Sequence, residues 1–253
     1  MKLLTFRLQG KMAHFRRYYS NSSALTYSIP PRTTITGIIA GLLGYERDTY
    51  YDLFSLDKCK IAVANRAPIK KQVQKMNLLM VKSLNDFNGS KEHHSQTPTE
   101  YILPQNIRSG IIDYQVWMYH QDKEVMEKLS QLFQSTRYGY SSYGISLALG
   151  SASHLGWLQF EGELEGEEES ASRSIELSSV VPAKNITRLE MTYTADSSYR
   201  LIKEDIPLEF DQNRRLTEMG KGDMVINLLS NPIKAEVAKH VKLSNGNHIT
   251  WME

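Results

Sequence analysis

Residues 14–23 read His-Phe-Arg-Arg-Tyr-Tyr-Ser-Asn-Ser-Ser and bring cationic, aromatic and hydroxyl side chains close together. Arg16 and Arg17 can each bind a phosphate through two parallel hydrogen bonds. Tyr18 and Tyr19 offer ring faces on which unpaired bases can stack. This combination predicts a surface for single-stranded nucleic acid. An amphipathic edge strand with solvated arginines and half-buried tyrosines fits the composition equally well.

A second cluster, Pro-Pro-Arg-Thr-Thr at residues 30–34, precedes an apolar run whose spacing predicts a helix up to residue 43. Thr33 or Thr34 can cap the start of this helix, and Gly44 can end it. Arg32 and the hydroxyl groups would then lie at the helix start, where free N–H groups and the helix dipole favour phosphate. The two clusters together predict a groove for a single strand.

Further candidates for phosphate or base contacts follow along the chain. Lysines at the base of a polar arm predict phosphate attraction, with solvated surface lysines as the alternative. A loop rich in Tyr and Gly around residues 137–144 can bring rings and backbone N–H groups to a nucleic acid, although a plain helix-to-strand loop is nearly as well supported. These additional candidates are Lys70, Lys71, Lys75, Lys82, Arg137, Tyr140 and Tyr143.

Side chains suited to general acid–base catalysis are Tyr45, Lys91, His93 and His94. They would have to come within hydrogen-bond reach of a scissile phosphate. Tyr45 follows a helix-ending glycine, where a packed ring is the simpler interpretation, and the histidines stand in a polar stretch that suits solvated side chains. Adjacent histidines rarely converge on one ion, so we expect no metal site and no cofactor. Each of these side chains therefore has a simpler structural interpretation than catalysis.

The charges are unevenly distributed. The whole chain has 30 Lys+Arg and 28 Asp+Glu, a formal net charge of +2. Residues 1–82 hold 14 Lys+Arg and 4 Asp+Glu, which gives +10, and residues 83–253 give −8. Such an asymmetry indicates a surface that faces a polyanion. The N-terminal part is therefore the expected location of a nucleic acid.

The pattern of elements supports an α+β fold. Strands are predicted over residues 2–9, 60–67, 73–81 and 112–118, and a second helix follows the N-capping residue Asp122. Extended segments are predicted at 145–149 and 155–160, and residues 83–110 form a polar, turn-rich arm. The order strand, helix, strand, strand or arm, strand, helix, strand is what a ferredoxin-like split βαβ unit requires.

The C-terminal third predicts a smaller β-rich region. The run at residues 161–170 contains six Glu and predicts a solvated hairpin tip or linker. Asn245-Gly246 is a strong signal for a hairpin turn. We therefore divide the chain into residues 1–162, with the arm at about 83–110, and residues 163–253.

No apolar run approaches the ~20 residues of a membrane helix, and no secretory signal is visible. The single Cys59 excludes a disulfide framework. A cytoplasmic protein without a membrane partner is therefore expected.

Two stretches resemble a known family. Residues 15–22, continuing through 25–27 to 30–45, are similar to the N-terminal signature of the Cas-five (Cas5) family, and Tyr-Gly-Ile-Ser-Leu-Ala-Leu-Gly-Ser at 143–151 resembles the strand and glycine turn after its second helix. These proteins are CRISPR-associated RAMP subunits of type I Cascade complexes, and this sequence resembles the type I-B branch most. The resemblance is strong over about residues 1–65 and weak over the arm and the C-terminal third.

The resemblance implies a ferredoxin-like, RRM-like RAMP domain with a protruding thumb at about residues 83–110. It implies a non-catalytic subunit that caps the 5′ repeat-derived handle of the crRNA, joins the large subunit to the backbone subunit, and meets target DNA only indirectly through the complex. Carried over position by position, the handle-contacting group is Arg16, Arg17, Tyr18, Tyr19, Asn21, Ser22, Arg32, Thr33 and Thr34. Single-stranded RNA with splayed bases suits these side chains.

Two alternatives remain open. One branch of the family, type I-C, cleaves repeat RNA without metal by using Tyr, Lys and His, and Tyr45, Lys91, His93 and His94 would then be the catalytic candidates. The other alternative is a general RNA-binding protein unrelated to CRISPR.

Overall fold

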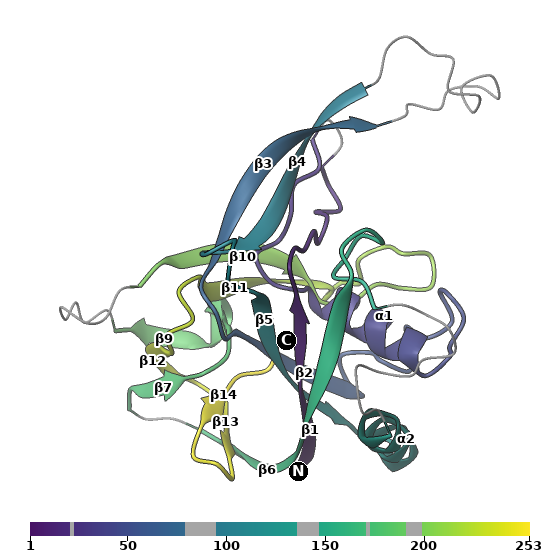
Figure 1. Ribbon diagram of the computed structural model, residues 1–253. Coiled ribbons are helices and arrows are strands. Elements are labelled where there is room, and N and C mark those ends of the chain that lie inside the picture. The colour runs from purple at the N-terminus through teal and green to yellow at the C-terminus, as the bar shows by residue number, and fades with distance from the viewer. Residues whose placement is uncertain (21–22, 79–94, 136–146, 171–172, 191–198) are drawn as a thin grey trace.

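Four antiparallel strands form the centre of the protein (Figure 1). The computed structural model describes residues 1–20, 23–78, 95–135, 147–170, 173–190 and 199–253. Strand β1 (Lys2–Gly10) pairs with β5 (Ile112–His120) on one edge and with β6 (Gly156–Glu169) on the other, and β2 (Cys59–Asn65) pairs with the outer edge of β5. The spatial order of these strands is therefore β2-β5-β1-β6. The predicted strands at 2–9, 60–67 and 112–118 and the α+β class are confirmed.

Two helices supply apolar side chains to the same core as these strands. Helix α1 (Arg32–Leu42) buries Ile35 and Ile39, and α2 (Lys123–Gln134) buries Leu129 and Phe133. The Phe133 ring lies 5.2 Å from the ring of Phe6 on β1. Alternation along β1 explains the arrangement, because every second side chain of a strand points to the same face.

The ends of the helices follow the sequence only in part. Asp122 caps α2 as predicted, because its carboxylate accepts a hydrogen bond of 2.8 Å from the Glu124 N–H. Gly44 ends α1 with a positive φ of 81°, as predicted. The start of α1 differs from the prediction. Its N-cap residue is Pro31, and no side chain forms a capping hydrogen bond, so neither Thr33 nor Thr34 caps this helix.

The acidic run at residues 161–170 is not a hairpin tip or linker. Residues 161–169 belong to β6, which first pairs with β1 and then with β13 (His240–Leu243). The strand tolerates these carboxylates because cations from β1 and β2 pair with them. Lys2 Nζ lies 2.5 Å from Glu163, and Lys60 Nζ lies 2.8 Å from Glu168. The composition therefore indicated solvent exposure correctly but did not indicate the strand.

The C-terminal strands continue the central sheet. Beyond β13 the order is β14 (His248–Ile249), β7 (Ile175–Leu177), β12 (Ile233–Val237) and β9 (Ile186–Leu189), which completes nine strands. A separate three-stranded sheet has the order β10 (Leu201–Pro207), β11 (Lys221–Asn227), β8 (Val181–Pro182), and a 3-10 helix spans Ala183–Asn185. Gly246, with φ 86°, lies in the turn between β13 and β14, which confirms the predicted hairpin.

A two-stranded ribbon projects from this body (Figure 1). Strand β3 (Ile69–Leu78) pairs with β4 (Ser95–Pro104) along its whole length. The predicted arm at 83–110 therefore includes a regular strand, while residues 79–94 lie outside the described residues. The predicted division at 162 and 163 falls inside β6, and none of the helices in the described segments is long and apolar enough to cross a membrane.

Candidate nucleic-acid interface

The chain between β1 and α1 lies against the projecting ribbon (Figure 1). Ala13 forms a bridge with Ile102 of β4, and Ala24 forms a second bridge with Thr99. Hydrogen bonds from Ala13 N–H to Ile102 O and back from Ile102 N–H measure 3.1 and 2.9 Å. We call residues 11–31 the basic-aromatic segment. Although the described residues of this segment, 11–20 and 23–31, have almost no regular structure of their own, the ribbon fixes their path.

The basic-aromatic segment combines buried anchors with exposed side chains. Phe15 and Tyr27 are buried, and their strand-like neighbours Arg16 and Thr26 form a bridge inside the segment. Tyr18 and Tyr19 are each 48% exposed, with their rings edge to face at 5.2 Å. Exposed rings of this size are available to stack on bases. Arg16 is exposed too, and its guanidinium makes one hydrogen bond of 3.1 Å, to Ser20 O.

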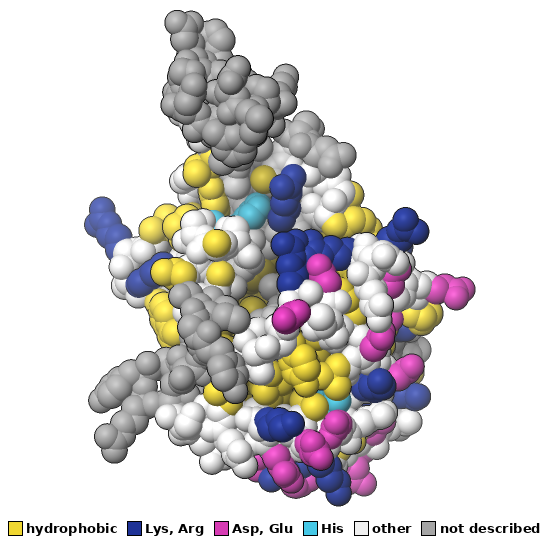
Figure 2. All heavy atoms as spheres, turned by 90° about the vertical axis from the view of Figure 1, so that its right-hand side faces the viewer, with side chains coloured by type: hydrophobic (Ala, Val, Ile, Leu, Met, Phe, Trp, Pro, Cys, Tyr) yellow, Lys and Arg dark blue, Asp and Glu magenta, His cyan; other side chains and the backbone are white. Residues whose placement is uncertain are grey.

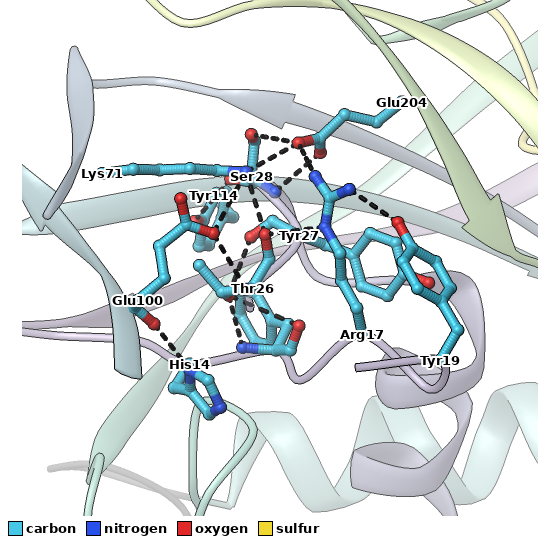
Figure 3. A network of polar contacts seen from close by, with 11 residues as sticks. His14, Arg17, Tyr19, Thr26, Tyr27, Ser28, Lys71, Glu100, Tyr114 and Glu204 are labelled. Atoms are coloured by element: carbon cyan, nitrogen blue, oxygen red, sulfur yellow. Dashed lines mark hydrogen bonds and ion pairs between the residues drawn. The ribbon is translucent and has the colours of Figure 1, made fainter. Parts of the chain in front are cut away.

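The next side chain, Arg17, is held inside the protein (Figure 3). Its guanidinium donates to Glu204 Oε1 at 2.8 Å, to Tyr19 Oη at 2.7 Å and to Thr26 O at 3.2 Å. Glu204 belongs to β10 in the C-terminal part, and its side chain is only 6% exposed. The guanidinium also lies 5.3 Å from the centre of the Tyr27 ring, within cation–π range.

Lys71 of β3 reaches the same carboxylate. Its ammonium group donates to Glu204 Oε1 at 2.7 Å and to Thr26 O at 2.9 Å. Ser28 completes the environment of Glu204, since its N–H and hydroxyl donate to the two carboxylate oxygens at 2.8 and 2.9 Å. We call Arg17, Lys71 and Glu204 the ion-pair node.

A second carboxylate, Glu100 of β4, supports the basic-aromatic segment from the ribbon. It accepts a hydrogen bond of 3.0 Å from the Thr26 N–H, and its own carbonyl accepts one of 2.7 Å from His14 Nδ1. Two acids from distant parts of the chain therefore hold the segment in place.

The other predicted lysines differ in exposure. Lys75 on β3 is exposed, and Lys70 is half-buried with its ammonium group donating to Gln105 O at 3.1 Å. Figure 2 shows a group of Lys and Arg side chains near the middle of one face with acidic side chains at its lower margin, and further Lys and Arg side chains beside acidic ones in the lower half.

Arg32 does not face solvent, and its predicted contact with RNA is wrong. The residue is 1% exposed, and its guanidinium donates to four carbonyl oxygens at 2.6–2.9 Å. These carbonyls belong to Leu208, Phe54, Ser55 and Cys59. Arg32 thus ties the start of α1 to the loop before β2 and to the C-terminal part.

The start of α1 is a poor anion site for the same reason. Pro31 and Arg32 are buried, and the N–H groups of Thr34 and Ile35 both donate to Pro31 O, at 2.9 and 3.1 Å. Thr33 and Thr34 are half-buried, and the carbonyl of Thr33 accepts from the Thr36 hydroxyl. The predicted phosphate site at this helix is not formed.

Several predicted residues lie outside the described residues. These are Asn21, Ser22, Lys82, Lys91, His93, His94, Arg137, Tyr140 and Tyr143. Of the catalytic candidates, Tyr45 is described; it is 40% exposed, and its ring packs edge-on at 6.5 Å from Phe54. Within the described ranges, no group of three or more His, Cys, Asp or Glu is arranged to hold a metal ion.

Glu204 and Glu100 were absent from the sequence prediction. For Glu204 a signal exists, because Ile202, Glu204 and Ile206 alternate along β10 and place a carboxylate on the inward face. A buried acid needs a cation or several donors, so this position alone indicates buried partners. Nothing in the sequence identifies Arg17 and Lys71 as those partners.

Comparison with known proteins bears on the N-terminal part most directly. Residues 3–124 match the model of a family described as CRISPR-associated protein (Cas5). This range contains the basic-aromatic segment, α1 and the projecting ribbon. No curated protein matches the chain.

Solved structures match over nearly the whole chain at low identity. A crystal structure of a CRISPR protein from Archaeoglobus fulgidus is 12% identical, with 98% of both chains covered and a TM-score of 0.56. A chain of a structure titled CRISPR RNA-guided surveillance complex is 12% identical over 93% of this chain and 92% of that one, with a TM-score of 0.47. The Archaeoglobus structure shows that the fold is shared.

Proposed function

The chain belongs, through residues 3–124, to the family of CRISPR-associated Cas5 proteins, and on this premise we propose that it is a non-catalytic crRNA-binding subunit of a type I, I-B-like Cascade complex. In this role it caps the 5′ repeat-derived handle of the crRNA and joins the large subunit to the backbone subunit. Target DNA is met indirectly, through the complex, and the complex is cytoplasmic.

The fold supports this assignment. The antiparallel order β2-β5-β1-β6, with α1 and α2 as the crossovers, supports the proposal of a ferredoxin-like split βαβ unit. The RAMP domain proposed for residues 1–162 is built on these strands, with residues 163–253 as the smaller β-rich region. The ribbon of β3 and β4 is the base of the proposed thumb.

The observation that carries the proposal is the presentation of Arg16, Tyr18 and Tyr19. All three are exposed, on a segment whose backbone is bonded to the ribbon and whose ring anchors Phe15 and Tyr27 are buried. Preorganised cationic and aromatic groups reduce the entropy lost when a flexible strand binds.

Binding to a labelled RNA that carries the handle tests the proposed phosphate contact of Arg16. We expect Arg16→Gln to weaken binding and to reduce the slope of log affinity against log salt by about 0.7, the value for one lost phosphate contact with single-stranded nucleic acid. Arg188→Gln is the matched control, because it removes an exposed arginine from β9 at the far end of the nine-stranded sheet. Equal effects of the two substitutions would contradict a handle site at Arg16.

The stacking part has a separate test. Tyr18→Ala should cost about 1–3 kcal/mol of binding free energy if one base stacks on this ring, with no change in the salt slope because no charge is lost. Tyr18→Phe keeps the ring and should bind like the unaltered protein. A loss that is the same for both variants would point to the hydroxyl group instead of the ring.

The same RNA, incubated without metal, tests the absence of catalysis. We expect the repeat RNA to remain intact over the time in which binding is complete. A discrete cut that is lost on replacing Tyr45, His93 and His94 would overturn the non-catalytic assignment and favour a metal-independent endoribonuclease of the type I-C kind.

A further inference from the structure

Glu204 has the environment of a fixed structural anion. Its side chain is 6% exposed, and its two oxygens accept four hydrogen bonds of 2.7–2.9 Å, from Arg17, Lys71 and the N–H and hydroxyl of Ser28 (Figure 3). A buried carboxylate is tolerated only where donors and cations replace its hydration. These donors come from the basic-aromatic segment and from β3, whereas Glu204 itself belongs to β10.

Both cations of the ion-pair node are committed to protein acceptors. The side chains of Arg17 and Lys71 are 22% and 20% exposed, and each also donates to the carbonyl oxygen of Thr26. A phosphate group that took the place of Glu204 on these cations would leave that carboxylate buried without its partners. Arg16, by contrast, is exposed and has no carboxylate partner in the described structure.

We propose that Glu204 is a positioning residue for RNA binding. It holds Arg17 and Lys71 in a clamp that fixes residues 15–20 and 23–28, and phosphate contacts fall on Arg16 and not on Arg17 or Lys71. The C-terminal part of the chain thereby sets the shape of the RNA-facing segment. This inference rests on the proposed function, because it assigns a role within the same binding surface.

The clamp joins parts of the chain that no local structure connects. The described residues that the clamp fixes, 15–20 and 23–28, contain no helix and no strand longer than a single bridge. Arg17 approaches from the segment, Lys71 from the ribbon and Glu204 from the three-stranded sheet. Because Arg17 and Lys71 both donate to Glu204 Oε1 and Ser28 donates to both oxygens of this carboxylate, loss of the acid removes the contacts that tie the segment to β10. Ordering such a segment again on RNA binding would reduce the affinity.

Glu204→Gln gives a test in which charge and positioning predict opposite signs. The substitution makes the chain more positive, so electrostatics alone predicts tighter binding to RNA. The clamp predicts binding about tenfold weaker, since the segment must be ordered when the RNA binds. Asp205→Asn is the matched control, because it removes the neighbouring charge, whose nearest cation, Lys221 at 3.5 Å, is exposed. We expect this control to bind as tightly as the unaltered protein or slightly more tightly.

The salt dependence of RNA binding by Arg17→Gln and Lys71→Gln distinguishes a positioning role of these cations from direct contact with phosphate. Both variants should bind more weakly while keeping the salt slope of the unaltered protein, whereas Arg16→Gln should lower it by about 0.7. If Arg17→Gln and Lys71→Gln lower the slope by this amount, or if Glu204→Gln binds more tightly with a steeper slope, the two cations are phosphate ligands and the inference is wrong.

Ser28→Ala covers the case in which Glu204→Gln does not fold. It removes one hydroxyl donor to Glu204 and no charge. We expect a smaller loss of affinity, about threefold, at an unchanged slope. An unchanged affinity in this folded variant would contradict the clamp. Failure of the proposed function looks different, because the unaltered protein itself would then not bind the handle RNA.

Discussion

Arg16, Arg17 and Arg32 are the same residue type, and the structure gives them three different environments. Arg16 is exposed, Arg17 is paired with a buried acid, and Arg32 is bound by backbone carbonyls inside the core. The charge of an arginine indicates its chemistry but not its partner. The partner depends on where the fold places the nearest carboxylates and carbonyls.

Arg32 is expected to contribute stability and not RNA affinity. Arg32→Met keeps a long side chain but removes the guanidinium hydrogen bonds to four carbonyl oxygens, of which Ser55 O keeps its backbone donors. We expect the free energy of unfolding to fall by about 3–5 kcal/mol. Urea denaturation followed by circular dichroism measures this loss. A stable variant with weakened RNA binding would contradict the structural role.

At the scale of elements, the turn before β6 is fixed by close contact with the basic-aromatic segment. The His14 N–H donates to Leu149 O at 3.0 Å, and Gly150 follows with a φ of 95°. A Cβ atom at Gly150 would overlap the carbonyl group of His14. This glycine therefore permits both the backbone conformation and the close approach.

Gly150→Ala and Gly162→Ala separate these two requirements. Gly162 also has a positive φ, 110°, but a Cβ there would meet nothing within 4 Å. We expect Gly162→Ala to cost about 1–2 kcal/mol of stability from backbone strain. Gly150→Ala should cost about 2–5 kcal/mol, because overpacking adds to the strain. Equal losses in thermal or urea unfolding would show that the contact with His14 is unimportant.

The buried His240 on β13 should make the protein less stable in mild acid. His240 is buried, its ring lies 4.9 Å from that of His248, and Glu169 is 3.5 Å from its Nε2 without a hydrogen bond. Burial and the neighbouring His248 lower the pKa of His240 below 6.5, while Glu169 opposes the shift and Lys242 adds to it. The unfolded chain therefore takes up a proton before the folded one does.

The free energy of unfolding should accordingly fall as the pH decreases through 6.5, until the lower pKa of the folded state is passed. Urea denaturation at several pH values between 7.5 and 5.5 measures this dependence. In His240→Gln the dependence should be smaller, with the remainder assigned to groups such as His154, whose pKa is lowered by burial and by His14. An unchanged pH dependence would exclude His240 as a contributor.

Local pattern predicted the elements well where side-chain spacing decides the structure. Alternation placed β1 and β5, and a capping aspartate placed the start of α2. The acidic stretch of β6 was missed, because its stability depends on Lys2 and Lys60 from other strands. The candidate site shows the same division. Exposure of Arg16 and the two tyrosines agrees with the sequence, whereas burial of Arg32 and the pairing of Arg17 depend on residues up to 187 positions away.

For the whole molecule, the two predicted regions share one core. Ile206, Leu208 and Met224 from the C-terminal part pack in the same cluster as Phe6 and Ile35. Strand β6 belongs to both regions, since it pairs with β1 and with β13. Removing either part would therefore expose apolar surface of the other.

We expect the chain to unfold in a single cooperative transition. Circular dichroism and proteolysis should give the same midpoint in urea, and residues 1–162 alone should fail to fold. Two separate transitions, or a stable fragment of residues 1–162, would show that the regions are independent domains.

Ion pairs between the N-terminal and C-terminal parts of the chain explain some of its uneven charge. The N-terminal +10 includes cations that the C-terminal acids neutralise, such as Lys2, Lys60 and Lys71. Part of the charge asymmetry thus holds the two regions together, and only the exposed remainder is available to RNA.

The positions of the three tryptophans allow intrinsic fluorescence to report on the contact between residues 1–162 and residues 163–253. Trp117 and Trp251 are buried where β5 meets the C-terminal strands, and Trp157 is 37% exposed on β6 with its indole N–H bonded to Gln9. The basic-aromatic segment contains no tryptophan. Tryptophan emission will therefore shift to longer wavelength when the contact between the two regions opens to water. Rearrangements confined to the basic-aromatic segment will leave the emission of the two buried indoles unchanged.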